Sequence, residues 1–477
     1  MSERNVNENR FVNRNQTESS FHSAVASLCM CSLANAFVII NVFPYSGYMV
    51  LHLIPKSTPE NAGIYAGFLA SSFMIGRFVT AYWWGRCADT FGRVVVLKFS
   101  LVLSTLFCLL FGLAKTYRTA FLWRLCLGMT NAVTSTSKTL ASEIGHGDEV
   151  KERQAMGLVV GMRSWGFLLG PAIGGFLASP VKQYPKNPFW QSGWRHRILE
   201  EYPFLLPNIA VAMFCIVSTI MVSFLIEETL QDDRTFSLPR HQQNPEVQNL
   251  IADPCAKEDK KQERSIWSNL ATRKHMIFYW MFSFVVTVID EAFPLFCIST
   301  DGGLSLDEGS IGKILSSAGL LFAIFQYAVY SLLTSRFGLY PSIFIGCVFG
   351  LVPVSLVPLS IWFELNNRPQ WFVFGYLGLV LGASKIMACT CFSGLAIATN
   401  KTVNIERRAR MNSFVLLGGS IAKGLGPIFA GFLVTISLSQ GSLINNEMGP
   451  AVIFGTIGIM GLIVSYAALR LKKADNV

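Results

Sequence analysis

The stretch Gly85-Arg-Cys-Ala-Asp-Thr-Phe-Gly-Arg93 decides how this chain can fold. It is a short polar turn between two apolar runs, at about 61–84 and 94–114, and each run is long enough to cross a bilayer as a helix. We therefore predict two membrane helices joined by a tight charged turn at one mouth of the protein. Four of its residues are candidates for a gate that holds the two helices in one conformation: Gly85, Asp89, Gly92 and Arg93.

The composition extends this interpretation to the whole chain. Of 477 residues, 52% are hydrophobic and only 14% are charged, which is typical of a polytopic membrane protein. The alternating pattern of barrel strands is missing, so the spans are expected to be helices. We therefore predict an all-α membrane protein with twelve transmembrane helices, at about 23–45, 61–84, 94–114, 118–142, 155–178, 203–226, 275–298, 310–334, 339–361, 371–398, 409–435 and 449–469.

The chain divides into two similar halves around a polar, basic linker at 227–274. Leu169-Gly-Pro-Ala-Ile-Gly-Gly-Phe-Leu177 in the first half is matched by Leu425-Gly-Pro-Ile-Phe-Ala-Gly-Phe-Leu433 in the second. Parallel six-helix repeats that rock about a central site are the architecture of alternating access. We expect five segments: a disordered tail at 1–22, a six-helix half at 23–226, the linker at 227–274, a second half at 275–470 and a short tail at 471–477.

Lysine and arginine set the orientation of the spans. With twelve spans both termini lie on one side, and most basic residues outside the spans fall on that side. We therefore expect both termini to be cytoplasmic. The net charge of +10 follows from this topology and indicates no nucleic-acid partner.

A second motif lies in the fifth span. It fits the pattern G-x8-G-x3-G-P-x2-G-G without a mismatch, and glycines at this spacing let helices pack closely, while proline bends the helix. An ordinary packing face of small residues is the alternative interpretation. The residues of the motif are Gly157, Gly166, Gly170, Pro171, Gly174 and Gly175.

Charges inside the spans are costly unless they are paired or face water, so they mark candidate site residues. The deep acids Asp290 and Glu291 are neighbours on one helix and cannot face the same point, so one is expected to exchange a proton while the other pairs with a lysine. The deep bases predict a cavity with surplus positive charge that suits an anion or an anionic metal chelate. Salt bridges between helices are the alternative, and both roles can coexist. These bases are Arg124, Lys138, Arg163, Lys385 and Lys423.

The sequence gives no sign of an enzyme, a cofactor or a bound metal. Most of the eleven cysteines lie inside spans and the six histidines are scattered, so neither forms a metal-ligand cluster. We find no nucleophile elbow and no phosphate loop. The expected partners are a small-molecule or ion substrate, protons and the lipid bilayer, and we expect a monomer.

Together these residues resemble the major facilitator transporters, in which the 85–93 turn is a signature and the glycine motif is typical of antiporters. Gly76–Arg93, Gly170–Pro185, Tyr202–Pro207 and Glu228-Thr-Leu230 resemble the zinc-induced facilitator-like branch in particular. The resemblance implies a proton-coupled exporter of zinc, zinc chelators or other small ions and organic anions, in a vacuolar or plasma membrane. It covers nearly all of the membrane region.

Three departures broaden the expected substrate beyond zinc. Plant members carry a Cys-Pro-Gly-Cys sequence before the first span, a histidine after Glu-Thr-Leu and a basic residue after Gly-Arg; this chain lacks the first and has Gln231 and Val94 at the other two places. A broad drug/proton antiporter is an alternative, with an apolar pocket lined by aromatic residues. A non-transporting sensor or scaffold is a third. The candidate aromatic residues are Trp83, Trp84, Trp165 and Trp280.

Overall fold

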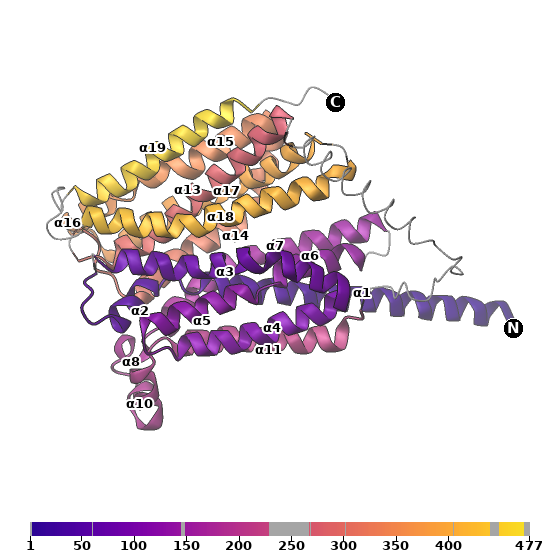
Figure 1. The fold of residues 1–477 in the computed structure, drawn as a ribbon, viewed down its shortest axis with the longest axis horizontal. Coiled ribbons are helices and arrows are strands. Elements are labelled where there is room, and N and C mark those ends of the chain that lie inside the picture. The colour runs from indigo at the N-terminus through magenta and orange to yellow at the C-terminus, as the bar shows by residue number, and fades with distance from the viewer. Residues whose placement is uncertain are drawn as a thin grey trace, which may run out of the picture.

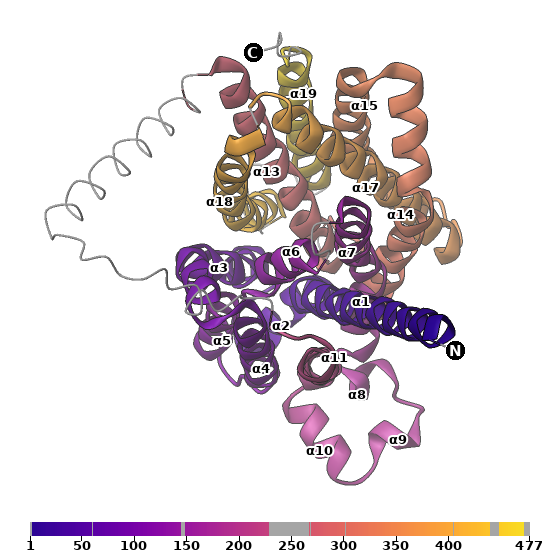
Figure 2. The ribbon, with the colours of Figure 1, turned by 90° about the vertical axis from the view of Figure 1, so that its right-hand side faces the viewer.

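The computed structural model describes residues 2–59, 61–144, 148–228, 267, 269–300, 302–403, 405–438 and 448–471, without the side chains of 2–19, 149, 153, 163, 164, 167, 405–410 and 413. The regular elements in these residues are helices, as predicted, and they form two bundles (Figures 1 and 2). Most of the predicted linker and of the C-terminal tail lies outside the described residues.

In the described residues the N half has seven helices of eleven or more residues and four shorter ones, α2, α8, α9 and α10, of which the last three follow one another. These three lie between α7 and α11 and project from one end of the bundle (Figure 1). The helices are α1 (Ser2–Ile40), α2 (Ser46–Leu53), α3 (Ala62–Phe91), α4 (Arg93–Gly112), α5 (Tyr117–Met129), α6 (Val133–Glu143), α7 (Glu149–Leu177), α8 (Pro180–Gln183), α9 (Pro188–Gln191), α10 (Gly193–Glu201) and α11 (Leu205–Leu225).

The C half repeats this arrangement with long helices after the linker. One of its spans is interrupted by a 3-10 helix, η2, which lies between α15 and α16. The elements are α13 (Leu270–Ile298), α14 (Glu308–Phe337), α15 (Leu339–Leu351), η2 (Val352–Leu356), α16 (Leu359–Leu365), α17 (Gln370–Asn400), α18 (Ile405–Leu438) and α19 (Gly449–Leu469).

Ten of the described segments are long and apolar enough to cross a membrane. The fourth predicted span is divided into α5 and α6, and within the described side chains of the fifth, α7, the apolar segment Leu168–Leu177 is shorter than a span. When the fourth and fifth predicted spans are added to the ten, the number of membrane helices fits the twelve expected. The disorder expected for residues 1–22 stays a prediction.

The prediction of a turn over residues 85–93 is wrong in its length, because the turn is much shorter. α3 continues to Phe91 and α4 begins at Arg93, so Gly92 alone separates the two helices. The backbone of Gly92 has a φ of 103°, a region that side chains rarely allow. Glycine therefore makes the tight reversal possible, and the rest of the polar stretch is helical.

The break between α5 and α6 is stabilised by side chains from neighbouring helices. Ser100 Oγ donates to the carbonyl of Thr130 at 2.7 Å and accepts from the amide of Ala132 at 2.9 Å. The side chain of Asn131 donates to Asn35 Oδ1 at 2.7 Å. Irregular backbone at membrane depth is tolerated only where protein groups or water supply the missing hydrogen bonds. The fourth span can therefore be discontinuous without exposing polar backbone to lipid.

The two halves pack tightly at one end of the bundle, which we call the closed end. It carries α2, α8 and α16, and the N and C halves converge there in Figure 1. A Cβ on Gly63 would lie 2.8 Å from the carbonyl oxygen of Gly431, and a Cβ on Gly67 would overlap the carbonyl of Pro427. Backbones in such close contact require glycine at both positions.

At the closed end, polar contacts also join the N half to the C half, near the start of α14. Ser179 Oγ donates to Glu308 Oε1 at 2.9 Å, and the hydroxyl of Tyr48 donates to the carbonyl of Leu306. Both contacts connect the N half with the C half. The closed end is thus held by backbone packing between α3 and α18 and by hydrogen bonds around the start of α14.

The opposite end, which we call the motif end, carries the Gly92 turn, the end of α19 and the start of α7. Among the described residues, no atom lies within 4 Å of a Cβ added to Gly85 in α3 or to Gly157 in α7. These two glycines therefore have free space beside them, whereas Gly63 and Gly67 at the closed end are packed against the backbone of α18.

Most of the fifth-span glycines pack α7 against other helices. A Cβ on Gly166 would meet Ala36, one on Gly170 would meet Ile40, and one on Gly174 would meet the carbonyl of Asn41, all in or next to α1. Gly175 instead contacts Gly312 at the start of α14. The motif therefore joins the first span to the fifth and reaches the C half at the closed end.

Gly67→Val should open the closed end. The added side chain would overlap the carbonyl of Pro427, and overpacking of this kind costs about 1–3 kcal/mol. Spin labels at positions 56 and 368, introduced in a chain without its native cysteines, should report longer distances between the halves. Gly455→Ala, where an added Cβ meets nothing within 4 Å, is the control and should leave the distances unchanged. Unchanged distances in Gly67→Val would contradict the packing described.

Candidate functional site

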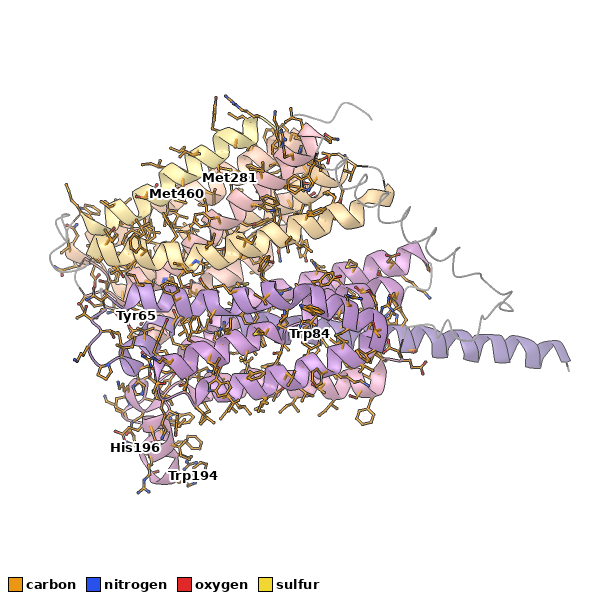
Figure 3. The ribbon with its side chains drawn as sticks, viewed as in Figure 1. Tyr65, Trp84, Trp194, His196, Met281 and Met460 are labelled. Carbon is orange, nitrogen blue, oxygen red and sulfur yellow. The ribbon has the colours of Figure 1, made fainter. Side chains whose placement is uncertain are left out.

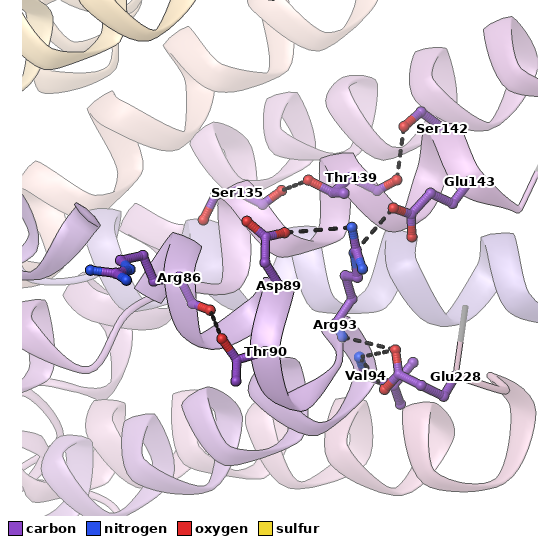
Figure 4. A network of polar contacts seen from close by, with 10 residues as sticks. All are labelled: Arg86, Asp89, Thr90, Arg93, Val94, Ser135, Thr139, Ser142, Glu143 and Glu228. Atoms are coloured by element: carbon purple, nitrogen blue, oxygen red, sulfur yellow. Dashed lines mark hydrogen bonds and ion pairs between the residues drawn. The ribbon is translucent and has the colours of Figure 1, made fainter. Parts of the chain in front are cut away.

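Arg93 is the centre of an ionic network at the motif end (Figure 4). Its guanidinium lies 3.5 Å from Asp89 Oδ1, measured from Nη2, and 3.1 Å from Glu143 Oε1, measured from Nε. Asp89 is one turn earlier in α3, and Glu143 is the last residue of α6. The network therefore ties the α3–α4 turn to the discontinuous fourth span.

Glu228 completes this network from the end of the N half. Its carboxylate accepts hydrogen bonds from the backbone amides of Arg93 at 2.8 Å and Val94 at 3.0 Å, the first residues of α4. A carboxylate at a helix N-terminus satisfies amides that have no partner within the helix and interacts favourably with the helix dipole. Sequence reasoning noted Glu228 only as part of a family resemblance and missed this capping role.

Of the four candidate gate residues, Asp89, Gly92 and Arg93 lie at the α3–α4 turn, and Gly85 lies earlier in α3. Asp89 has a side chain that is 76% exposed, and the partners described for it and for Arg93 belong to the N half. In this conformation the network stabilises the N half internally. That it also holds the two halves together in another conformation stays a prediction.

Asp290 and Lys385 form an ion pair in the C half. Lys385 Nζ donates to Asp290 Oδ1 at 2.6 Å, which joins α13 to α17. Each side chain keeps 22% of its surface exposed, so the pair lies at the edge of the protein interior. The structure therefore brings together two residues that the sequence analysis selected separately.

Glu291, the next residue in α13, is almost completely buried. Its exposure is 1%, and both carboxylate oxygens lack a hydrogen-bond partner among the described residues. Successive helical residues lie about 100° apart, which explains why Asp290 and Glu291 have different surroundings. The charges that act on Glu291 are those of Asp290 in the C half and Arg124 in the N half.

Arg124 is also buried, and it caps a helix. Its two terminal nitrogens donate to the carbonyls of Val38 at 2.9 Å and Ile39 at 3.2 Å, at the C-terminal end of α1. The guanidinium carbon lies 5.1 Å from the ring centroid of Phe73 and 5.5 Å from that of Phe111. The guanidinium thus satisfies carbonyls that the helix leaves free, and its charge also acts on Glu291.

The other three predicted bases are arranged differently. Lys138 is exposed on α6, which lies between α3 and α7 when the protein is viewed from the motif end (Figure 2). Lys423 is half-buried on α18, and the side chain of Arg163 lies outside the described residues. The structure thus places Lys385 and Lys423 on separate helices of the C half and Lys138 on the N half.

A metal centre is not found in the part of the chain that the structure describes. No group of three or more histidine, cysteine, aspartate or glutamate side chains there could hold a metal ion. At the closed end, a pocket of about 380 Å³ is lined partly by His52, Lys182 and Glu308. Burial and the charge of Lys182 lower the pKa of His52, which favours its neutral imidazole.

Glu228→Ala should destabilise the protein, because the amides of Arg93 and Val94 would lose their acceptor. Loss of an N-terminal cap costs about 0.5–2 kcal/mol. Thermal unfolding in detergent should show a lower Tm. Glu227→Ala, which removes the same charge one residue earlier from an exposed position, should leave Tm close to that of the unmodified chain. Equal Tm values for the two variants would contradict the capping role.

Comparison with known proteins identifies the fold and the family. A model of the Major Facilitator Superfamily matches residues 25–395. In the crystal structure of the nucleoside transporter NupG, 100% of the chain corresponds to 94% of this one, with a TM-score of 0.67 and 13% identity. This agreement confirms the expected fold of two related helical halves.

Two similar sequences narrow the type of transporter. Zinc Induced Facilitator-Like 1 from Arabidopsis thaliana is 30% identical over 414 residues, which cover 85% of this chain and 82% of the plant protein. The multidrug transporter mfsB from Aspergillus fumigatus is 31% identical over 209 residues, 43% of this chain and 33% of the fungal one. The expected resemblance to the zinc-induced facilitator-like branch is thereby confirmed. The chain belongs to the Major Facilitator Superfamily, as a multi-pass membrane transporter of the zinc-induced-facilitator-like and multidrug-efflux type.

Proposed function

We propose that the protein is a proton-coupled antiporter that exports or sequesters a small anionic or metal-chelating solute. The observation that carries the proposal is Glu291, a buried carboxyl without a hydrogen-bond partner among the described residues. In this proposal the motif end and both termini face the cytoplasm. The membrane is the vacuolar membrane or the plasma membrane. The relatives' names support the transporter class, and the solute class rests on the charges of this chain.

Glu291 is the proton carrier in this mechanism. An unpaired carboxylate in a membrane interior costs several kcal/mol, whereas the neutral acid is tolerated there. The conformation with the closed end packed buries Glu291, so it favours the protonated carboxyl. A conformation in which this side chain reaches water would release the proton. Proton binding and the position of the halves are therefore linked.

Asp290 and Lys385 provide the point at which a solute can act. Their ion pair is partly exposed, so an anionic group can compete with Asp290 for Lys385 without entering a sealed interior. Lys138 and Lys423 add positive charge on the two halves. Solute binding would thus replace the Asp290–Lys385 ion pair, which lies within the C half. In its place, the solute would contact lysines of both halves.

Exchange requires coupling through conformation. Direct electrostatics alone would favour cotransport, because a neutral Glu291 leaves the cavity more positive and raises its affinity for an anion. In an antiporter the proton and the solute must each stabilise a different position of the halves. The discontinuous fourth span and the glycine contacts at the closed end are the structural features that would permit this movement.

Proteoliposomes with an internal pH dye test two points together: whether the protons move opposite to the solute, and which solute is transported. External zinc alone, zinc with a carboxylate chelator, and the chelator alone are added in separate arms. An antiporter makes the interior more alkaline as solute enters, whereas a cotransporter makes it more acidic. We expect alkalinisation with the chelator present and none with zinc alone. A response to zinc alone would show that the acids outweigh the lysines and would refute the anionic-solute proposal.

Glu291→Gln should reduce solute-driven proton movement to the level of empty liposomes, because the amide cannot exchange a proton. Asp290→Asn should strengthen solute binding, because it removes the carboxylate that competes with the solute for Lys385, and it should leave proton movement in place. Glu364→Gln, an exposed acid at the closed end, is the matched control and should behave like the unmodified chain. Coupling that survives with both Asp290 and Glu291 replaced by amides would overturn the assignment.

A broad drug/proton antiporter is the second candidate, and the multidrug transporter among the similar sequences favours it. In that case hydrophobic cations would compete with the solute and would themselves drive proton movement. The same liposomes, given a lipophilic cation instead of the chelator, distinguish the two functions.

A further inference from the structure

A groove of about 490 Å³ lies between three helices of the C half, α13, α18 and α19. Its lining is apolar along its whole length and includes aromatic, branched and methionine side chains. Figure 3 labels two of the lining residues, which lie beside α19. Representative lining residues are Trp280, Met281, Ile421, Leu425, Met460 and Ile463.

The apolar lining and its exposed residues indicate that the groove opens toward the membrane. Ile421 and Leu425 are each two residues from Lys423, and two residues turn a helix by about 200°, so they lie on nearly the opposite side of α18 from that lysine. Both are exposed, at 46% and 53%, and Ile463 of α19 is 55% exposed. Exposed apolar side chains on the outside of a membrane helix contact lipid.

Three cations extend the groove toward the motif end. Arg273 and Lys274 precede Trp280 and Met281 by seven residues, and Arg470 follows Ile463 by seven. Seven residues are close to two helical turns, about 10 Å, so each cation lies on the same face of its helix as a groove residue. All three are exposed, and they stand where α13 begins and α19 ends.

We propose that this groove binds one anionic phospholipid, with an acyl chain along the apolar lining and the phosphate held by Arg273, Lys274 and Arg470. Charge complementarity selects an anionic headgroup, since basic residues near the membrane surface attract anionic lipids. Trp267, 37% exposed and part of the lining, has the amphipathic side chain typical of the headgroup level. The proposal is independent of the transported solute.

Native mass spectrometry of the full chain in detergent tests this site. The protein is incubated with equal amounts of phosphatidylglycerol and phosphatidylcholine that have the same acyl chains. We expect one phosphatidylglycerol to be retained preferentially. Each charge removed, by Arg273→Gln, Lys274→Gln or Arg470→Gln, should lower its retention about fivefold, because one basic residue near the surface contributes about 1 kcal/mol.

Two matched pairs separate this site from general lipid contact. Ile463→Trp fills the groove and should displace the lipid, whereas Leu462→Trp, equally exposed but outside the lining, should not. Arg368→Gln removes an exposed cation at the closed end and should leave retention unchanged. Equal retention of the two lipids, or equal loss in both members of a pair, would overturn the proposal. Displacement of phosphatidylglycerol by a lipophilic cation would also overturn it, in favour of a drug site.

Discussion

Hydrogen bonding of the backbone inside an apolar medium is the constraint on which the rest of this structure depends. Wherever a helix ends or breaks at depth, polar groups lose their partners, and lipid cannot replace them. Here side chains do so. Arg124 binds the last carbonyls of α1, Ser100 and Asn35 support the break in the fourth span, and Glu228 caps α4. Several charged and polar residues that look like binding groups in the sequence therefore have a structural task.

Glu291 differs from these residues, because its buried carboxyl takes no part in satisfying the backbone of the described residues. Its carboxyl is as deeply buried as Arg124, yet its oxygens have no hydrogen-bond partner in the described part of the chain. A site of this kind is costly when charged and inexpensive when neutral. The neighbouring ion pair of Asp290 and Lys385 is partly exposed and fully paired. Two adjacent acids thus have different surroundings, and the proposed proton role of Glu291 and solute role of Asp290 rest on this difference.

Much of the fold could be predicted from the sequence, because apolar length and internal repetition are local properties. The spans, the two halves and the glycine contacts of α7 follow from them. The division of the fourth span could not be predicted, because its support comes from Ser100 and Asn35 in other helices. The shortness of the 85–93 turn was missed as well, since polar residues can continue a helix until Gly92 ends it.

The sequence could supply candidate residues for the site but not their geometry, and their roles stay predictions. Charge inside apolar segments identified Asp290, Glu291, Lys385 and Arg124, and the structure shows which of them meet. Periodicity could not show that Arg124 reaches the end of α1, because the two are joined only by the folded chain. Glu228 was unpredictable for the same reason, since its partners lie in α4, far away in the sequence.

Infrared difference spectroscopy of the purified protein tests the central claim most directly, because it reports protonated carboxyl groups individually. The account predicts a protonated carboxyl band without solute that disappears when the chelator binds, and that is missing from Glu291→Gln but present in Asp290→Asn. A band that persists in Glu291→Gln, or one that solute binding leaves unchanged, would contradict the assignment of Glu291 as the proton carrier.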